Sequence, residues 1–152
     1  MESKISLPQT DNPLVIRTTF ENVHAWGKIC DLIRQPARIA GKEFYAYVEF
    51  LENDAFRDLT NQELLARVPS DYRHTFIFVV DNIAIRPPDF AVLIIDLYDE
   101  RGRTFRTIPS QIQGIENNLS ISNMDFSEFA ENVDEDGVFR GFKGVRGEGP
   151  HC

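Results

Sequence analysis

The sequence predicts an α+β fold: a single domain in which three to four helices pack against a mixed sheet of about five strands. Two short apolar runs carry this prediction. Asp81 follows the first run, at residues 75–80, and Asp96 follows the second, at residues 91–95. Runs of this length that are rich in β-branched and aromatic residues are typical of interior strands. Because neither run alternates strongly, we expect both faces of the sheet to be covered.

A single domain is expected because the chain has 152 residues, within the roughly 100–200 residues of an ordinary domain. We predict a loose leader at residues 1–13, the globular domain at residues 14–142 and a flexible Gly-rich tail at residues 143–152. The leader lacks the apolar centre of a signal peptide, and no apolar run approaches the roughly 20 residues that span a bilayer. The sequence therefore predicts a cytoplasmic protein whose two cysteines, Cys30 and Cys152, are free thiols.

The first half of the domain predicts a crossover unit of strand, helix and strand, which should be right-handed. Residues 14–18 form the first strand, and residues 22–34 form a helix whose apolar side chains share one face. Residues 44–51 alternate with the period of a strand. One face of this strand, expected in the core, carries Phe44, Ala46, Val48 and Phe50, and the other, a candidate ligand wall, carries Tyr45, Tyr47, Glu49 and Leu51.

Two capping boxes predict where later helices begin. In such a box, the side chains of two residues three positions apart each accept the backbone N–H of the other. The first box joins Thr60 and Glu63, before a helix that runs to about residue 68. The second joins Asp125 and Glu128, before a helix that runs to about residue 132.

A third strand at residues 104–108 is expected to complete an antiparallel meander with the two apolar runs. A tight loop with Gly102 in the left-handed conformation would join it to the second run. That register places Asp96 opposite Arg106, where a buried ion pair would form. Residues 115–122 predict a short strand after a turn of helix.

The net charge of −8 disfavours nucleic acids and anionic membranes as partners, because both require clustered Lys and Arg. Between Arg106 and Arg140 there is no basic residue. The candidate partner-binding residues in this segment are Glu128, Glu131, Asp134, Glu135 and Asp136. The leading hypothesis is therefore an acidic binding or interaction module, inhibitor-like or immunity-like, that recognises a basic protein partner by charge complementarity. Its oligomeric state is left open.

The alternative is a small cofactor-free enzyme, an isomerase, lyase or cyclase, that uses general acid–base catalysis on a small organic molecule. Its candidate catalytic residues are His74, Glu49, Arg106, Tyr47 and Asp96, and its candidate ligand-binding residues are Tyr45 and Tyr47. His74 or Glu49 would act as the base. Arg106 or Tyr47 would stabilise the charge that develops. One enclosed pocket would be lined by Tyr45, Tyr47, Glu49, His74 and Arg106. Small-molecule binding without turnover would use the same pocket.

Other chemistries find little support in the pattern. The sequence has no Gly-x-Ser-x-Gly nucleophile elbow and no phosphate-binding glycine loop. The three His residues are too far apart in sequence to indicate zinc. Residues 132–137 match the first half of an EF-hand loop, but Lys143 stands where a bidentate glutamate is required. No metal and no cofactor is therefore predicted.

Several segments have distinctive sequences: DNPLVIRT (11–18), AYVEF (46–50), HTFIFVVD (74–81), DLYD (96–99), RTFR (103–106) and NNLSISNMDF (117–126). Together they resemble a family of small uncharacterised proteins, a domain of unknown function, found in actinobacteria and some fungi. The resemblance covers residues 8–142 and implies that residues 115–142 belong to the domain. Because the family has no assigned activity, the resemblance implies no site residues.

Overall fold

The computed structural model describes residues 4–143 and confirms one α+β domain, with a mixed sheet of six strands, a separate sheet of two strands and four α-helices in that range. The strands are β1 (Leu14–Arg17), β2 (Ala37–Ile39), β3 (Lys42–Phe44), β4 (Glu49–Leu51), β5 (Phe76–Val80), β6 (Val92–Asp96), β7 (Thr104–Thr107) and β8 (Val138–Phe139). The helices are α1 (Val23–Arg34), α2 (Asn61–Ala66), α3 (Ile112–Ser120) and α4 (Phe126–Ala130), with 3-10 turns η1 (Asp54–Phe56) and η2 (Pro109–Gln111). None of these helices is long and apolar enough to cross a membrane. Apart from Lys143, the tail predicted at 143–152 lies outside the described residues.

The two apolar runs form the central strands of the larger sheet, as predicted. The strand order is β4-β1-β5-β6-β7-β8, so β5 and β6 lie side by side, and they run antiparallel. β1 runs parallel to β4 and β5, while β7 runs antiparallel to β6 and parallel to β8. Every residue of β5 and β6 is buried. The strand–helix–strand unit and the meander are thus confirmed, and β8 is an edge strand that the sequence did not predict.

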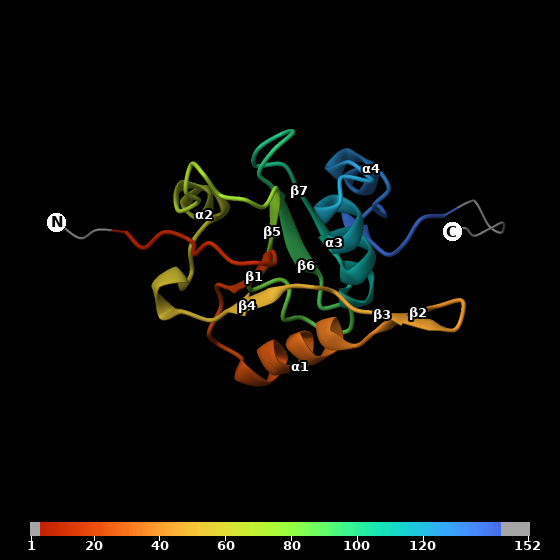
Figure 1. Ribbon diagram of the computed structural model, residues 1–152. Helices are drawn as coiled ribbons and strands as arrows, with labels where there is room; N and C mark the ends of the chain where they lie inside the picture. The colour runs from red at the N-terminus through yellow and green to blue at the C-terminus, as the bar shows by residue number, and fades with distance from the viewer. Residues whose placement is uncertain (1–3, 144–152) are drawn as a thin grey trace.

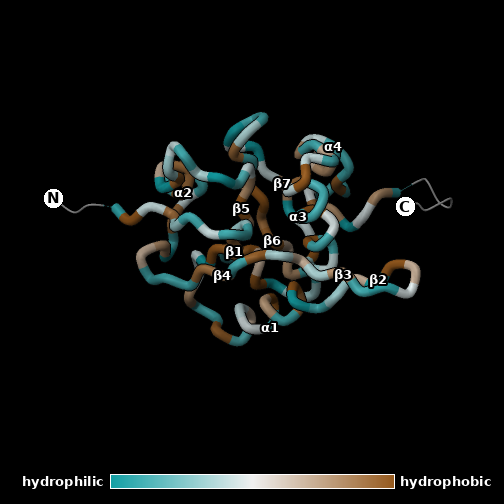
Figure 2. The backbone as a smooth tube through the Cα atoms, in the orientation of Figure 1, coloured by the Kyte–Doolittle hydropathy of each residue, from teal (hydrophilic) through white to brown (hydrophobic). Residues whose placement is uncertain are grey.

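Helices cover both faces of this sheet, so the strand side chains alternate between two apolar clusters. Helices α1, α3 and α4 lie on one side of the sheet (Figure 1). Their side chains pack against Phe76, Phe78 and Ile94. On the other face, side chains of η1 and α2 pack against Ile77 and Ile95. In Figure 2 the residues along β5 and β6 are coloured as hydrophobic, and the loops around them are mostly coloured as hydrophilic.

Part of the leader is anchored to the second cluster rather than loose. Leu7 is 2% exposed, and its backbone N–H donates to the carbonyl of Arg67 at 2.8 Å. The side-chain amide of Gln9 donates to the carbonyl of Asp71 at 3.0 Å. The leader therefore contributes buried apolar surface to the fold.

Both predicted capping boxes are confirmed. The Thr60 hydroxyl accepts the N–H of Glu63 at 3.1 Å, and the Glu63 carboxylate accepts the N–H of Thr60 at 2.8 Å. These bonds lower the pKa of Glu63, because they favour its charged form. Asp125 and Glu128 form the same arrangement before α4.

The strand predicted at residues 44–51 is wrong in its first half. β3 instead pairs with β2 as a hairpin, which extends away from the larger sheet (Figure 1). Its turn places Ala40 and Gly41 at positive φ of 53° and 81°, as a two-residue type I′ turn requires. Phe44, which was expected in the core, is 41% exposed. The other residues of its predicted core face do pack against the first cluster: Ala46, Val48 and Phe50.

The predicted pairing of Asp96 with Arg106 is also wrong, because Arg106 lies opposite Leu93. The carboxylate of Asp96 instead accepts the N–H groups of Tyr98 at 2.9 Å and Glu100 at 2.8 Å in the following loop. These side-chain bonds to the backbone hold the chain in a turn directly after β6. The loop is therefore longer than the predicted one, and the register of the meander shifts.

The strand predicted at residues 115–122 is wrong, because α3 occupies this part of the chain. The buried side chains of Ile112, Ile115 and Leu119 recur with helical spacing. Glu116 is buried beside them. The end of α3 lies against the segments that precede β1, β4 and β5.

Candidate functional site

Two adjoining hollows lie at the end of the sheet where strands β1, β4 and β5 begin and strand β6 ends. The first, of about 490 Å³, lies between the segments that precede these strands and the end of α3. The second, of about 360 Å³, lies between the end of β6 and the start of α4. Both are lined by Thr75, Phe76, Leu119 and Ser122. They form one continuous surface, which we call the α3 groove, with a first, His74 lobe and a second, Tyr98 lobe.

Four of the predicted functional side chains lie in or beside this groove. Tyr47 and His74 line the His74 lobe, and Asp96 lines the Tyr98 lobe. The carboxylate of Glu49 accepts the N–H of Asn12, another residue of the His74 lobe, at 3.0 Å. The parallel order β4-β1-β5 brings these groups together, because it aligns the starts of strands that are far apart in the sequence.

Arg106 and Tyr45 lie elsewhere, so the predicted residues do not line one pocket. Arg106 is at the opposite end of the sheet, where its guanidinium donates to both oxygens of Asp81 at 3.0 and 2.6 Å and to the carbonyl of Ala91 at 2.8 Å. Tyr45 follows the β2–β3 hairpin and donates to Glu43 at 3.1 Å, a bond that raises the pKa of Tyr45. Three strands separate β4, which carries Glu49, from β7, which carries Arg106.

Glu116 is a groove residue that the sequence interpretation missed. It is 4% exposed. Its carboxylate accepts the N–H of Tyr47 at 2.9 Å and the hydroxyl of Ser120 at 2.8 Å. Within residues 4–143 it forms no ion pair, although burying a charge without a counter-charge is unfavourable. Recognising the helical spacing of α3 would have placed this carboxylate among buried residues.

Among residues 4–143, one ring nitrogen of His74 has a hydrogen-bond partner and the other has none. Its Nε2 lies 2.8 Å from the carbonyl of Thr10. A carbonyl only accepts hydrogen bonds, so in the neutral imidazole Nε2 carries the proton and Nδ1 carries the lone pair. The ring also packs edge-on against Tyr72, with centroids 5.6 Å apart. The arrangement holds one orientation of the imidazole beside the groove.

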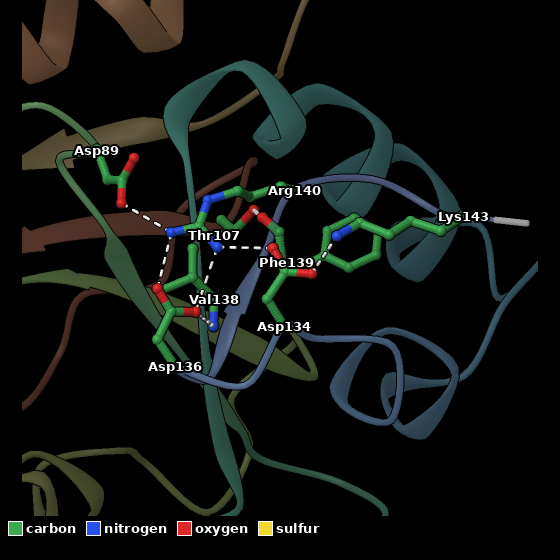
Figure 3. Close-up of polar contacts among 8 residues, drawn as sticks. All are labelled: Asp89, Thr107, Asp134, Asp136, Val138, Phe139, Arg140 and Lys143. Atoms are coloured by element: carbon green, nitrogen blue, oxygen red, sulfur yellow. Dashed lines mark hydrogen bonds and ion pairs between the residues drawn. The ribbon is translucent and has the colours of Figure 1, made fainter.

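The acidic residues predicted to bind a partner lie on and after α4, and most of them have local partners. Arg140 donates to Asp134 at 2.6 Å, Asp136 at 2.8 Å and Asp89 at 2.8 Å (Figure 3). Lys143 also contacts Asp134. The bonds from Lys143 and then Arg140 lower the pKa of Asp134, the bond from Arg140 lowers the pKa of Asp136, and the three carboxylates raise the pKa of Arg140. The carboxylates of the half EF-hand pattern are thus occupied by cationic side chains.

The other three members of the set differ in what they contact. Glu128 accepts the N–H of Asp125 at 2.8 Å, and Glu131 lies 3.6 Å from Arg103. Glu135 is exposed and, in the part of the chain that the structure describes, has no hydrogen bond or ion pair through its side chain. Most of the predicted acidic surface is therefore compensated within the molecule.

Replacing Arg140 with glutamine is expected to destabilise the protein at pH 7 and to make its stability less sensitive to acid. The folded-state pKa values of Asp134 and Asp136 are lowered, so the unfolded chain takes up protons first as the pH falls past the ordinary aspartate value of about 3.9. The stability that Arg140 contributes is present above that pH and is lost as the pH falls through the lowered values. Urea unfolding at a series of pH values measures the difference in the free energy of unfolding between the two proteins, and this difference should become smaller in acid. Arg38→Gln, on the exposed hairpin, is the control, and an equal narrowing there would contradict the prediction.

Comparison with known proteins gives a family and no activity. No curated protein and no solved structure matches the chain. A family model described as a domain of unknown function, DUF6924, matches residues 12–142. This range includes both lobes of the α3 groove except for Asp11. Because the match covers most of the sequence, the chain belongs to the DUF6924 family.

Proposed function

We propose that this domain is a non-catalytic binding module that recognises a basic segment of a protein partner, and that the α3 groove is its recognition surface. The observation that carries the proposal is the buried carboxylate of Glu116, which lines the groove without a cationic partner among the described residues. A cationic group of a ligand would supply the missing counter-charge.

The charge of the whole groove supports the same assignment. Its carboxylates belong to Asp11, Asp96, Asp99, Glu116 and Asp125. Its basic side chains are those of Arg73 and His74, and both line the first lobe. Arg73 already lies 3.4 Å from Asp11. A groove with this balance attracts cations and repels anions.

The rim of the groove has the composition of a protein interface. Tyr47, Tyr98 and Ile121 are 63%, 74% and 64% exposed. Tyrosine is enriched among the side chains that protein interfaces bury. These three side chains would lose contact with water on binding, which adds a hydrophobic contribution to the electrostatic one.

This proposal keeps the basic partner that the sequence suggested and moves the contact surface. The carboxylates of Asp134 and Asp136, after α4, already pair with basic side chains of the protein. The carboxylates of the groove have few basic side chains near them. A ligand that pairs with Glu116 gains a charge-assisted bond, which is worth about 1.5–3 kcal/mol. A ligand that pairs with Asp134 or Asp136 has to displace Arg140.

Tetralysine amide is the probe that tests the proposal, with tetraglutamine amide as the uncharged control. Calorimetry should detect tetralysine binding that weakens as salt is raised, since salt screens exposed charges. Glu116→Gln keeps the hydrogen-bond acceptor and removes the charge, and it should lower the affinity about tenfold. Glu135→Gln removes one charge from the surface after α4 and should leave the affinity within about twofold. Equal losses in the two variants, or no binding of tetralysine, would reject the proposal.

A cofactor-free isomerase, lyase or cyclase is the second candidate, and the orientation of His74 favours it. The bond from Nε2 to Thr10 leaves Nδ1 as a base, in the same lobe as Tyr47 and Glu116. This candidate requires turnover that disappears in His74→Asn. Tetralysine binding that persists in His74→Asn, with no turnover of any compound that binds, would support the module instead.

We also expect the protein to be cytoplasmic, as the sequence suggests. Cys30 is a buried free cysteine, which fits a reducing compartment. Burial raises its pKa to about 11, which makes the thiol unreactive. An origin in actinobacteria or fungi stays a prediction of the resemblance.

A further inference from the structure

We infer that the Tyr98 lobe of the α3 groove is a receptor for one long cationic side chain, a lysine or arginine of the partner segment. The inference rests on the proposed function, because it names which part of the basic segment enters the groove and where. Its observations are separate from the one that carries the function, since Glu116 lines only the other lobe.

The floor of the lobe is apolar and suits an aliphatic stem. It is formed by Phe76, Leu119, Met124 and Phe126. Phe76 and Phe126 are 1% and 4% exposed, and Met124 is half-buried. Lysine and arginine lay their methylene groups along apolar surface of this kind while their charged ends stay with polar groups.

The polar groups of the lobe are acidic and suit a cationic end. Asp96, Asp99 and Asp125 line it, and no basic side chain does so among the residues described. Asp96 is 2% exposed and forms no ion pair within residues 4–143. Its two oxygens each accept one backbone N–H, from Tyr98 and Glu100. A carboxylate has about four acceptor positions, so each oxygen can accept one more donor.

The carboxylate of Asp96 is also held in place, which suits a binding group. The two backbone bonds fix its orientation after β6, and the paired position on β5 is Phe76, on the floor of the lobe. A side chain lying over Phe76 would thus bring its charged end to an oriented acceptor. Preorganisation of this kind lowers the entropic cost of binding.

The size and rim of the lobe favour a single side chain over a folded element. At about 360 Å³ it is near the lower limit of small-ligand sites, roughly 300–1,000 Å³. Tyr98 is 74% exposed at its rim, where its ring can cover an ammonium or guanidinium group. Asp99 is exposed next to it and, in residues 4–143, has no hydrogen bond through its side chain.

Blocked tripeptides of Gly-Lys-Gly and Gly-Arg-Gly test this inference by amide NMR titration of the full chain. The controls are the tripeptides with norleucine or citrulline, which keep the length of the side chain and lose its charge. The cationic tripeptides should shift the amides of Tyr98, Asp99 and Ser122, and the uncharged ones should bind about tenfold more weakly. Asp99→Asn and Tyr98→Ala should each weaken binding about threefold to tenfold, because each removes a contact with the cationic end. Both side chains are exposed, so neither substitution should affect the fold.

The outcomes separate this inference from the proposed function. Glu116→Gln should leave tripeptide binding within about twofold while it weakens tetralysine binding. Tetralysine binding in the groove, with tripeptide shifts confined to Tyr47 and Ser120, would overturn the inference and leave the function standing. Equal affinity for the norleucine and lysine tripeptides would overturn the cationic assignment of the lobe. Absence of binding by every cationic probe would overturn both proposals.

Discussion

Replacing Phe78 with alanine is expected to lower the free energy of unfolding by about 3–5 kcal/mol. Phe78 is at the middle of β5, is 0% exposed and packs edge-on against Phe76 at 5.5 Å between ring centroids. The loss combines the transfer free energy of the ring with the cavity left in a close-packed core. Urea unfolding at pH 7 measures the change.

Phe44→Ala is the matched control for this prediction. The sequence placed Phe44 in the core, but its side chain is 41% exposed on the β2–β3 hairpin. Its removal should cost less than about 1 kcal/mol. A similar loss in both variants would show that the hairpin packs against the body as a strand of the main sheet would, and would contradict the fold described above.

Replacing Arg106 with methionine is expected to cost about 2–4 kcal/mol, because it leaves Asp81 without its counter-charge. The side chains of Arg106 and Asp81 are 17% and 27% exposed, so the loss should fall below that of a fully buried pair. Methionine keeps the apolar stem of arginine, which limits the change in packing. The same urea unfolding measurement applies.

A double-mutant cycle identifies the partner of Arg106. Combining Arg106→Met with Asp81→Asn should give a coupling energy above about 1 kcal/mol, whereas combining it with Asp96→Asn should give less than about 0.5 kcal/mol. Asn at position 96 can still accept one loop N–H, which limits the local disruption. The opposite result would restore the Asp96–Arg106 register that the sequence suggested and would contradict the observed pairing.

The parts of the fold that could be predicted from the sequence are those set by local physics. The residues of β5 and β6 are apolar over a length that suits a strand. A short run without polar residues is typical of a strand that is buried on both faces. The capping box of Thr60 and Glu63 works through side chains three positions apart, so the sequence alone reveals it.

The parts that were wrong depend on choices between local alternatives. Asp96 could pair across the hairpin or bond to the loop that follows it, and it does the second. Ala40 adopts a positive φ that is uncommon for a residue other than glycine, and the β2–β3 turn depends on it. In α3, Asn117 and Asn118 weakened the helical signal, while Ile112, Ile115 and Leu119 carried it.

The candidate site could be predicted only in pieces. Tyr47 and Glu49 were identified from the alternation of residues 44–51, and His74 from its place at the start of a strand. The sheet order then brings all three to one end of the sheet. Glu116 was missed because its segment was interpreted as a strand. The compensation of Asp134 by Arg140 and Lys143 was missed because charge counting along the sequence ignores which cations fold back onto the acids.

We propose that the α3 groove, and not the acidic surface after α4, recognises basic segments. An amide chemical-shift map of the protein titrated with tetralysine amide tests it most directly, because it locates the contact without relying on any substitution. If the groove binds the peptide, the largest shifts will be those of Tyr47, Glu116 and Ser122, and the shifts of Glu131 and Glu135 will be small. Shifts centred on Glu131 to Asp136, with the groove unperturbed, would contradict it.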